Sequence, residues 1–182
     1  DRRTHGEQQP ARYAEAMRGA YRALARLRAE GVVRAIGLGV NDWDVCRDAL
    51  HDADFDGFML AGRYTLLDRS AAELLPLCEQ RGVALVIAGV YNSGVLASGA
   101  VPGARFDYRV ASSDVLQRVR VLEAVCRRFA VPLRAAALQF PRHARAVASV
   151  VLGARSAAEV EDALRMAHHP IPPALWEALG AS

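Results

Sequence analysis

The stretch VVLGARSAAEVEDAL, residues 150–164, runs from an apolar segment into an acidic amphipathic one with only a short turn between them. Its β-branched start is typical of a buried strand, and a Ser ahead of apolar residues at helical spacing is typical of a helix N-terminus. A corner of this kind exposes backbone N–H groups that suit an anion, whereas Glu159 and Glu161 would repel one. The stretch therefore predicts a strand-to-helix unit with a candidate binding corner.

The same unit recurs along the chain. Apolar runs alternate with amphipathic segments, which indicates parallel strands joined by right-handed helical crossovers, an α/β fold. Both a doubly wound sheet and a TIM (β/α)8 barrel satisfy this pattern, and about four units are half of the eight that close such a barrel. The predicted strands are 32–40, 55–64, 83–91 and 147–154; the predicted helices are 11–30, 42–53, 70–82, 113–130, 132–144 and 156–167.

Three segments fall outside this alternation. Residues 1–10 are charged and polar and predict a leader to the first helix. Residues 92–112 are rich in Gly, Ser, Ala and Pro and predict a long ordered loop. Residues 170–182 predict a short C-terminal helix. With 52% hydrophobic residues in 182, the chain is expected to form a single domain over 1–182.

Composition narrows the function classes. No stretch approaches the roughly 20 apolar residues of a membrane span, and the first residues do not resemble a secretory signal. A start at Asp1 without Met suggests a fragment or a processed product. Cys46, Cys78 and Cys126 are widely spaced and odd in number, which favours buried free thiols in a reducing cytoplasm over a metal site.

Charge argues against nucleic acid as a partner. The net charge is +3 and the pI about 9.0, but the basic residues are scattered beside Asp and Glu rather than gathered in a run with aromatics. The 23 residues counted together as Lys and Arg are all arginines. The absence of lysine excludes any mechanism that needs a lysine from this chain.

Four blocks of the chain resemble one family: LRAEGVVRAIGLGVND (27–42), RYTLLDRSAAELLPLCEQRGVALV (63–86), LQFPRHARAVASVVLGARSAAEV (138–160) and HHPIPPALWEAL (168–179). Together they are similar to the C-terminal half of the aldo-keto reductases, and most of all to their sugar-oxidising members, the fucose-type aldose 1-dehydrogenases. The resemblance implies a (β/α)8 barrel, here roughly its C-terminal half, and a nicotinamide cofactor. It also implies hydride transfer at C1 of an aldose or at another carbonyl or alcohol carbon.

The resemblance implies no catalytic residue in this chain. The family's tetrad of Asp, Tyr, Lys and His belongs to the first four strands of the barrel, and no block here matches any of the four. The absence of lysine establishes this for one member without an alignment. His5 falls in the polar leader, where the expected role is that of a solvated loop residue.

Cofactor contacts are implied after the first and third predicted strands. Asn41 matches an Asn that hydrogen-bonds the nicotinamide carboxamide, since an amide side chain both donates and accepts; a turn or cap role is the alternative. The family's aromatic that stacks on the nicotinamide falls at Gly89, so Tyr91 either takes over the stacking or packs under the loop. The following loop matches one that wraps the pyrophosphate, with these backbone N–H donors: Ser93, Gly94 and Val95.

The corner quoted first matches the clamp on the adenosine phosphate. Relatives that prefer NADP typically have Lys at position 153 and Arg at position 159, whereas this chain has Gly153 and Glu159. A carboxylate accepts from a ribose 2′-OH in other NAD sites, so NAD is implied over NADP, although Arg155 has the length to reach a phosphate. The alternative for Glu159 is a capping box with Ser156 and no ligand. The implied contacts are Gly153, Ala154, Arg155, Ser156, Glu159 and, near the adenine, Asp162.

Three hypotheses result. The first is the cofactor-binding half of an NAD(P)-dependent aldose dehydrogenase acting on a small sugar or carbonyl substrate. The second is an inactive half-barrel, a binding or assembly module or truncation product that self-associates through its exposed strand edges. The third, a doubly wound nucleotide-binding domain, lacks a G-x-G-x-x-G fingerprint after its first strand and ranks last.

Overall fold

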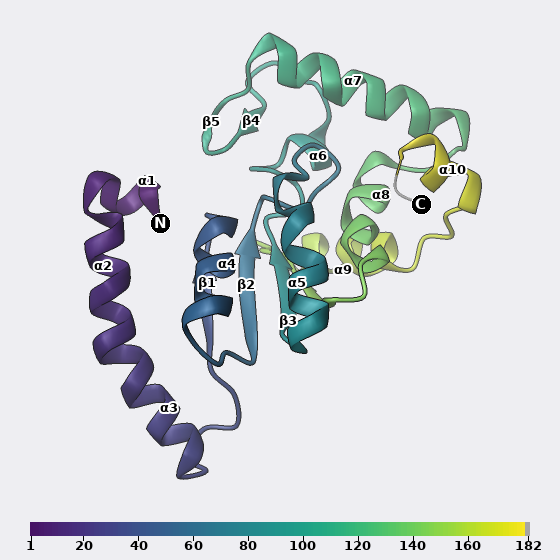
Figure 1. Ribbon diagram of the computed structural model, residues 1–182. Helices are drawn as coiled ribbons and strands as arrows, with labels where there is room; N and C mark the ends of the chain where they lie inside the picture. The colour runs from purple at the N-terminus through teal and green to yellow at the C-terminus, as the bar shows by residue number, and fades with distance from the viewer. Residues whose placement is uncertain (181–182) are drawn as a thin grey trace.

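A parallel four-stranded sheet forms the centre of the computed structural model, which describes residues 1–180 (Figure 1). Its strands lie in the order β1-β2-β3-β6, so each predicted strand pairs with the next one along the chain. Sequential parallel order is that of one half of a (β/α)8 barrel, whereas a doubly wound sheet reverses its order at a switch point. The strands are β1 (Gly37–Val40), β2 (Gly57–Ala61), β3 (Ala84–Ala88) and β6 (Val147–Val151).

Helices follow the strands as the crossovers require. Helices α4 and α5 lie against the sheet in Figure 1, and α5 ends at Gly82, whose φ of 65° is the left-handed conformation that stops a helix. The C-terminal helix is shorter than the predicted 170–182, and Ala181 and Ser182 lie outside the described residues. The helices are α4 (Trp43–Asp52), α5 (Leu74–Arg81), α7 (Ser113–Arg128), α8 (Leu133–Gln139), α9 (Ala157–Ala167) and α10 (Pro173–Ala178), with 3-10 turns at Ser70–Glu73 and Phe140–His143.

The two faces of the sheet differ in burial. Phe58 and Leu60 of β2 are buried on the face that carries the helices, while Met59 between them is 44% exposed on the other face. Small residues dominate that second face, and Gly37 has to be glycine because a Cβ there would lie 2.3 Å from the carbonyl oxygen of Gly57. The core therefore lies between the sheet and its helices, and the opposite face is uncovered in the described residues.

The N-terminal segment is more helical than predicted. The expected leader is itself helical, so that α1 (Arg2–His5), a 3-10 turn, α2 (Gln9–Ala16), a π-helical turn (Met17–Tyr21) and α3 (Arg22–Ala29) form an almost continuous helix. It stands beside β1 at the edge of the sheet (Figure 1) and contacts the sheet layer through Tyr21, whose ring centroid is 5.1 Å from that of Phe55. His5 lies on α1, exposed, rather than in a loop.

Two further predictions need correction. The first strand begins at Gly37, not at residue 32, because residues 31–36 form a turn and an irregular approach in which Val32 is 66% exposed. The predicted loop 92–112 contains helix α6 (Val95–Ser98) and a hairpin of β4 (Arg105–Phe106) and β5 (Arg109–Val110). The hairpin turn, Asp107–Tyr108, has φ values of 48° and 65°, which a two-residue turn requires but which Asn-Gly usually supplies. Within residues 1–180, no helix is both long and apolar enough to cross a membrane.

Candidate functional site

A cavity of about 670 Å³ opens at the carboxyl ends of the strands, between the loop after β3 and the corner that joins β6 to α9. Loops and helix starts converge at this end of a parallel α/β fold, where ligands bind. Most of the predicted cofactor-binding residues line the cavity: Tyr91, Ser93, Gly94, Gly153, Arg155, Glu159 and Asp162.

The other predicted residues lie elsewhere. Asn41 lines a separate recess of about 40 Å³ that shares Gly89, Asn92 and Ser93 with the main cavity. The side chain of Val95 is fully buried in the core, so that only its backbone is available to a ligand. Ala154 and Ser156 are exposed at the corner and do not line the cavity. The structure thus places Asn41 in a recess that adjoins the main cavity, while Ala154 and Ser156 line neither.

The loop after β3 is held in an unusual backbone conformation. Asn92, Ser93 and Gly94 have consecutive φ values of 44°, 60° and 100°. The Gly94 N–H donates to the carbonyl of Tyr91 at 2.9 Å and is thereby used within the loop. Among the described residues, the N–H groups of Ser93 and Val95 have no acceptor. Two of the three predicted phosphate donors are therefore free, and the third is not.

A buried side-chain pair fixes this loop. The amide oxygen of Asn92 accepts from the Thr65 hydroxyl at 2.6 Å, and its Nδ2 donates to the carbonyl of Gly62 at 3.3 Å. The Thr65 oxygen in turn accepts from the N–H groups of Leu67 and Asp68. Both side chains are buried, so the loops after β2 and β3 are locked together. Sequence reasoning missed this pair, although an Asn before Ser-Gly signals a left-handed turn.

The corner before α9 is built by a modified capping box. The Ser156 hydroxyl accepts from the N–H of Glu159 at 3.2 Å, as a cap predicts. The Glu159 carboxylate does not return to Ser156 but accepts from the backbone N–H of Arg155 at 2.7 Å and from its Nη2 at 2.9 Å. Both bonds lower the pKa of Glu159, the backbone bond more than the side-chain bond, so Glu159 is ionised at neutral pH. The Arg155 side chain, 92% exposed, is paired with it.

The far wall of the cavity carries an arginine that the sequence analysis did not single out. Arg134, from the first turn of α8, places its Nη2 3.2 Å from Oδ1 of Asp162 on α9, and its Nε lies 3.0 Å from Oδ2. Arg165 also donates to Oδ1 of Asp162, at 3.0 Å. Burial, and then the negative charge of Asp162, raise the pKa of Tyr91, which therefore stays a neutral phenol. No resemblance block includes position 134, so no motif marked it.

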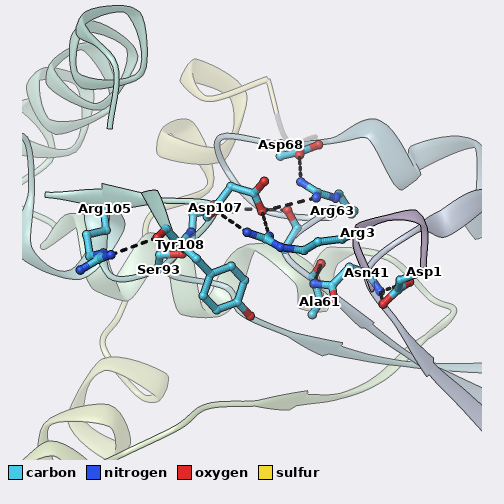
Figure 2. A network of polar contacts seen from close by, with 12 residues as sticks. Asp1, Arg3, Asn41, Ala61, Arg63, Asp68, Ser93, Arg105, Asp107 and Tyr108 are labelled. Carbon is cyan, nitrogen blue, oxygen red and sulfur yellow. Dashed lines mark hydrogen bonds and ion pairs between the residues drawn. The ribbon is translucent and has the colours of Figure 1, made fainter. Parts of the chain in front are cut away.

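The recess beside Asn41 is closed by a polar network (Figure 2). Asn41 donates its backbone N–H to the carboxylate of Asp1 at 2.9 Å and its Nδ2 to the carbonyl of Ala61 at 3.5 Å. Both partners are distant in the sequence, so these bonds are not those of a local turn or cap, and the amide oxygen of Asn41 has no protein donor among the described residues.

The hairpin turn completes this network (Figure 2). Asp107 accepts from Arg3 at 3.0 Å and from Arg63 at 3.5 Å, and Arg63 also donates to Asp68 at 3.1 Å. Tyr108, over which the guanidinium of Arg3 lies at 4.6 Å, lines the same recess as Asn41. The aromatic beside Asn41 is therefore Tyr108, and Tyr91 lines the main cavity instead.

The chain has a parallel half-barrel and a cavity at its carboxyl end, the place where barrel enzymes hold their ligands. The family model of the aldo/keto reductase family matches residues 4–181. The chain belongs to this family.

Two curated relatives are similar over most of the chain. A pyridoxal 4-dehydrogenase of Microbacterium luteolum is 46% identical over 162 residues, which are 88% of this chain and 47% of the relative. A D-threo-aldose 1-dehydrogenase of a Pseudomonas species is 42% identical over 166 residues, 90% of this chain and 50% of the relative. This chain thus spans about half the length of these relatives.

A solved structure supports the same fold. The aldo-keto reductase AKR11C1 of Bacillus halodurans, in its holo form, matches with a TM-score of 0.69 and 27% identity over 87% of this chain and 53% of its own. The match to half of a barrel agrees with the four sequential parallel strands observed here.

Proposed function

We propose that this chain supplies the cofactor-binding half of an NAD(P)-dependent oxidoreductase that transfers hydride at C1 of an aldose or at another carbonyl or alcohol carbon. The observation that carries the proposal is the cavity between the loop after β3 and the start of α9, where most of the residues implied by the family resemblance come together. A pyridoxal dehydrogenase and an aldose dehydrogenase among the relatives support a small carbonyl or alcohol substrate.

The residues at the cavity fit a dinucleotide. Its volume of about 670 Å³ lies within the usual range of cofactor pockets. A Cβ on Gly153 would meet no atom within 4 Å, so the backbone at the corner is open to close approach. Free N–H groups at Ser93 and Val95 supply neutral donors for a phosphate. The bound nicotinamide would supply hydride chemistry; the residues of this chain bind and orient it.

We place NAD ahead of NADP as the cofactor. The extra 2′-phosphate of NADP adds negative charge, and the corner offers it the ionised Glu159 rather than a free cation. Arg155 is not free either, because its guanidinium and its N–H both bond Glu159. A calorimetric titration with both cofactors tests this: tighter binding of NAD supports the proposal, and tighter binding of NADP contradicts it.

The chemical step needs residues from outside this chain. Hydride transfer to a carbonyl requires a proton donor at the substrate oxygen, and none of the 182 residues matches the family's tetrad. This chain by itself is therefore inactive in our proposal. A hydride-transfer assay checks this, and enzyme-like turnover by the chain alone would refute it.

The free edges of the sheet favour a second role, as an assembly module. Within residues 1–180 no further strand pairs with the outer edge of β1 or of β6, so both present unpaired backbone groups. A second copy of the chain could cover these edges. We also place the protein in the cytoplasm, because Cys46, Cys78 and Cys126 are all free and buried.

A further inference from the structure

The main cavity is lined by four charged residues, two arginines and the two carboxylates of Glu159 and Asp162. Of the residues that line it, two are arginines, Arg134 and Arg155. Arg155 is almost fully exposed and paired with Glu159, so it contributes little net charge to the interior. Arg134 is the remaining cation, and it comes from helix α8 rather than from either loop implied by the family resemblance.

Asp162 contacts Arg134 from one side only. The carboxylate lies along the edge formed by Nε and Nη2, at 3.0 Å and 3.2 Å. Nε is buried and, despite this ion pair, lacks a partner with hydrogen-bond geometry. Nη1 has no acceptor among the described residues. A guanidinium carries five N–H donors; with Nε buried and one Nη2 donor bonded to Asp162, the two donors of Nη1 and the second donor of Nη2 remain for a ligand.

The cluster around Asp162 has a net charge of +1. Its single carboxylate bonds both Arg134 and Arg165, the latter at 3.0 Å. Arg165 is exposed and does not line the cavity, whereas Arg134 does. Because Asp162 is shared between two arginines, its charge compensates that of Arg134 only in part, and Arg134 is the cation of this cluster that lines the cavity, as an anion site requires.

We propose that Arg134 is the cation that binds the phosphate groups of the dinucleotide in this cavity, with Asp162 as the residue that positions its guanidinium. The proposal rests on the proposed function and adds a residue to it. Neutral N–H groups of the loop after β3 and the guanidinium from α8 would then contact the phosphates from two walls.

A merely structural role would tie α8 to α9 through the ion pair and nothing more. The two roles differ in what they predict for ligands with and without phosphate. The probes are ADP, NAD and adenosine, titrated into the chain by calorimetry, with adenosine measured by competition. The variants are Arg134→Gln, the charge-conserving Arg134→Lys and the matched control Arg165→Gln, which removes the other partner of Asp162.

We expect Arg134→Gln to weaken ADP and NAD about tenfold or more and adenosine less than about twofold, because a charge-assisted bond to phosphate is lost. Arg134→Lys should lie between Arg134→Gln and the wild type, since it keeps the charge without the fork of donors. Arg165→Gln should change all three ligands less than about twofold.

Equal losses for ADP and adenosine, or equal effects of Arg134→Gln and Arg165→Gln, would overturn the role of Arg134 and leave the proposed function standing. A wild-type chain that binds neither ADP nor NAD would overturn both. Thermal melts show which variants fold. If Arg134→Gln does not fold, Arg134→Lys is used in its place. We then expect Arg134→Lys to lose affinity for ADP but not for adenosine, and equal losses of affinity would contradict the proposal.

Discussion

At the scale of single residues, the corner that suits an anion but carries acidic side chains has a physical explanation. Glu159 bonds the N–H and the guanidinium of Arg155, so its charge helps to build the corner instead of opposing it. The Ser156 cap could be predicted from the sequence, because a cap depends on neighbours three residues apart. The bond that the Glu159 carboxylate accepts from the N–H of Arg155, instead of from that of Ser156, could not be predicted, since it depends on the backbone path through Arg155.

The charge of Glu159 is expected to control the choice between NAD and NADP. Glu159→Gln removes the repulsion on a 2′-phosphate and releases Arg155, and we expect NADP to bind about tenfold more tightly with little change for NAD. Calorimetric titration measures both. The matched control is Glu161→Gln, an exposed carboxylate on the same helix that does not line the cavity. If both variants improve NADP binding equally, general charge rather than the corner sets the preference.

The side chain of Asn92 is expected to stabilise the fold, and asparagine is expected to adopt the left-handed backbone conformation of this position with little strain. Asn92→Ala leaves the buried Thr65 hydroxyl without its acceptor and puts Ala at a φ of 44°, and we expect a loss of about 1–3 kcal/mol in the free energy of unfolding. Asn92→Gly loses the same bond but relieves the backbone, so its loss should be smaller. Urea denaturation compares the two. An Asn92→Gly loss as large as that of Asn92→Ala would show that backbone strain is unimportant there.

At the scale of elements, the centres of strands and helices were predictable and their ends were not. The runs and spacing of apolar residues place β2, β3 and β6 correctly, because these strands pack on helices. The same signal extended the first strand to Val32, which the structure shows in a turn, because local apolarity does not reveal that a segment lies outside the sheet. The hairpin in 92–112 was missed because its Asp107–Tyr108 turn is held by distant arginines rather than by Asn-Gly.

The junction between α3 and β1 is expected to weaken in acid. The Asp56 carboxylate accepts from the Ile36 N–H at 2.7 Å and from Arg28 at 2.8 Å, and these bonds, in that order, lower its pKa. Because the folded-state pKa lies below the unfolded value of about 4, the stabilisation is present above pH 4 and is lost as pH falls through the folded pKa. Asp56→Asn should flatten the fall in stability below pH 4, as chemical denaturation at a series of pH values would show. An unchanged slope would contradict this role.

At the scale of the whole molecule, residues 1–180 form a half-barrel with one uncovered face and two sheet edges with which no further strand pairs. The uncovered face presents mostly small residues, among them Gly37, Gly57 and Ala84, which pair across three strands. Barrel interiors are normally filled by bulky side chains, so a partner that completes this one is expected to supply larger residues. The exposed edges were part of the half-barrel hypothesis drawn from the sequence, whereas this face could not be judged from the sequence pattern, because a helix-covered and an uncovered small residue look the same.

The open edges are expected to make the isolated chain associate. Unpaired parallel strands at β1 and β6 offer backbone groups to a second copy, so the average mass should rise with concentration. Multi-angle light scattering over a concentration series measures this. A monomer that persists at high concentration would show that the edges are protected.

Calorimetric titration with NAD measures whether the cavity between the loop after β3 and the start of α9 binds a nicotinamide dinucleotide. The variant Gly153→Trp places a large ring on a residue that lines the cavity, where an added Cβ meets no atom within 4 Å, while Ala154→Trp places the same ring on a neighbour that does not line it. We expect one NAD per chain for the wild type and for Ala154→Trp, and at least about tenfold weaker binding for Gly153→Trp. Equal binding by both variants, or no binding by the wild type, would contradict it.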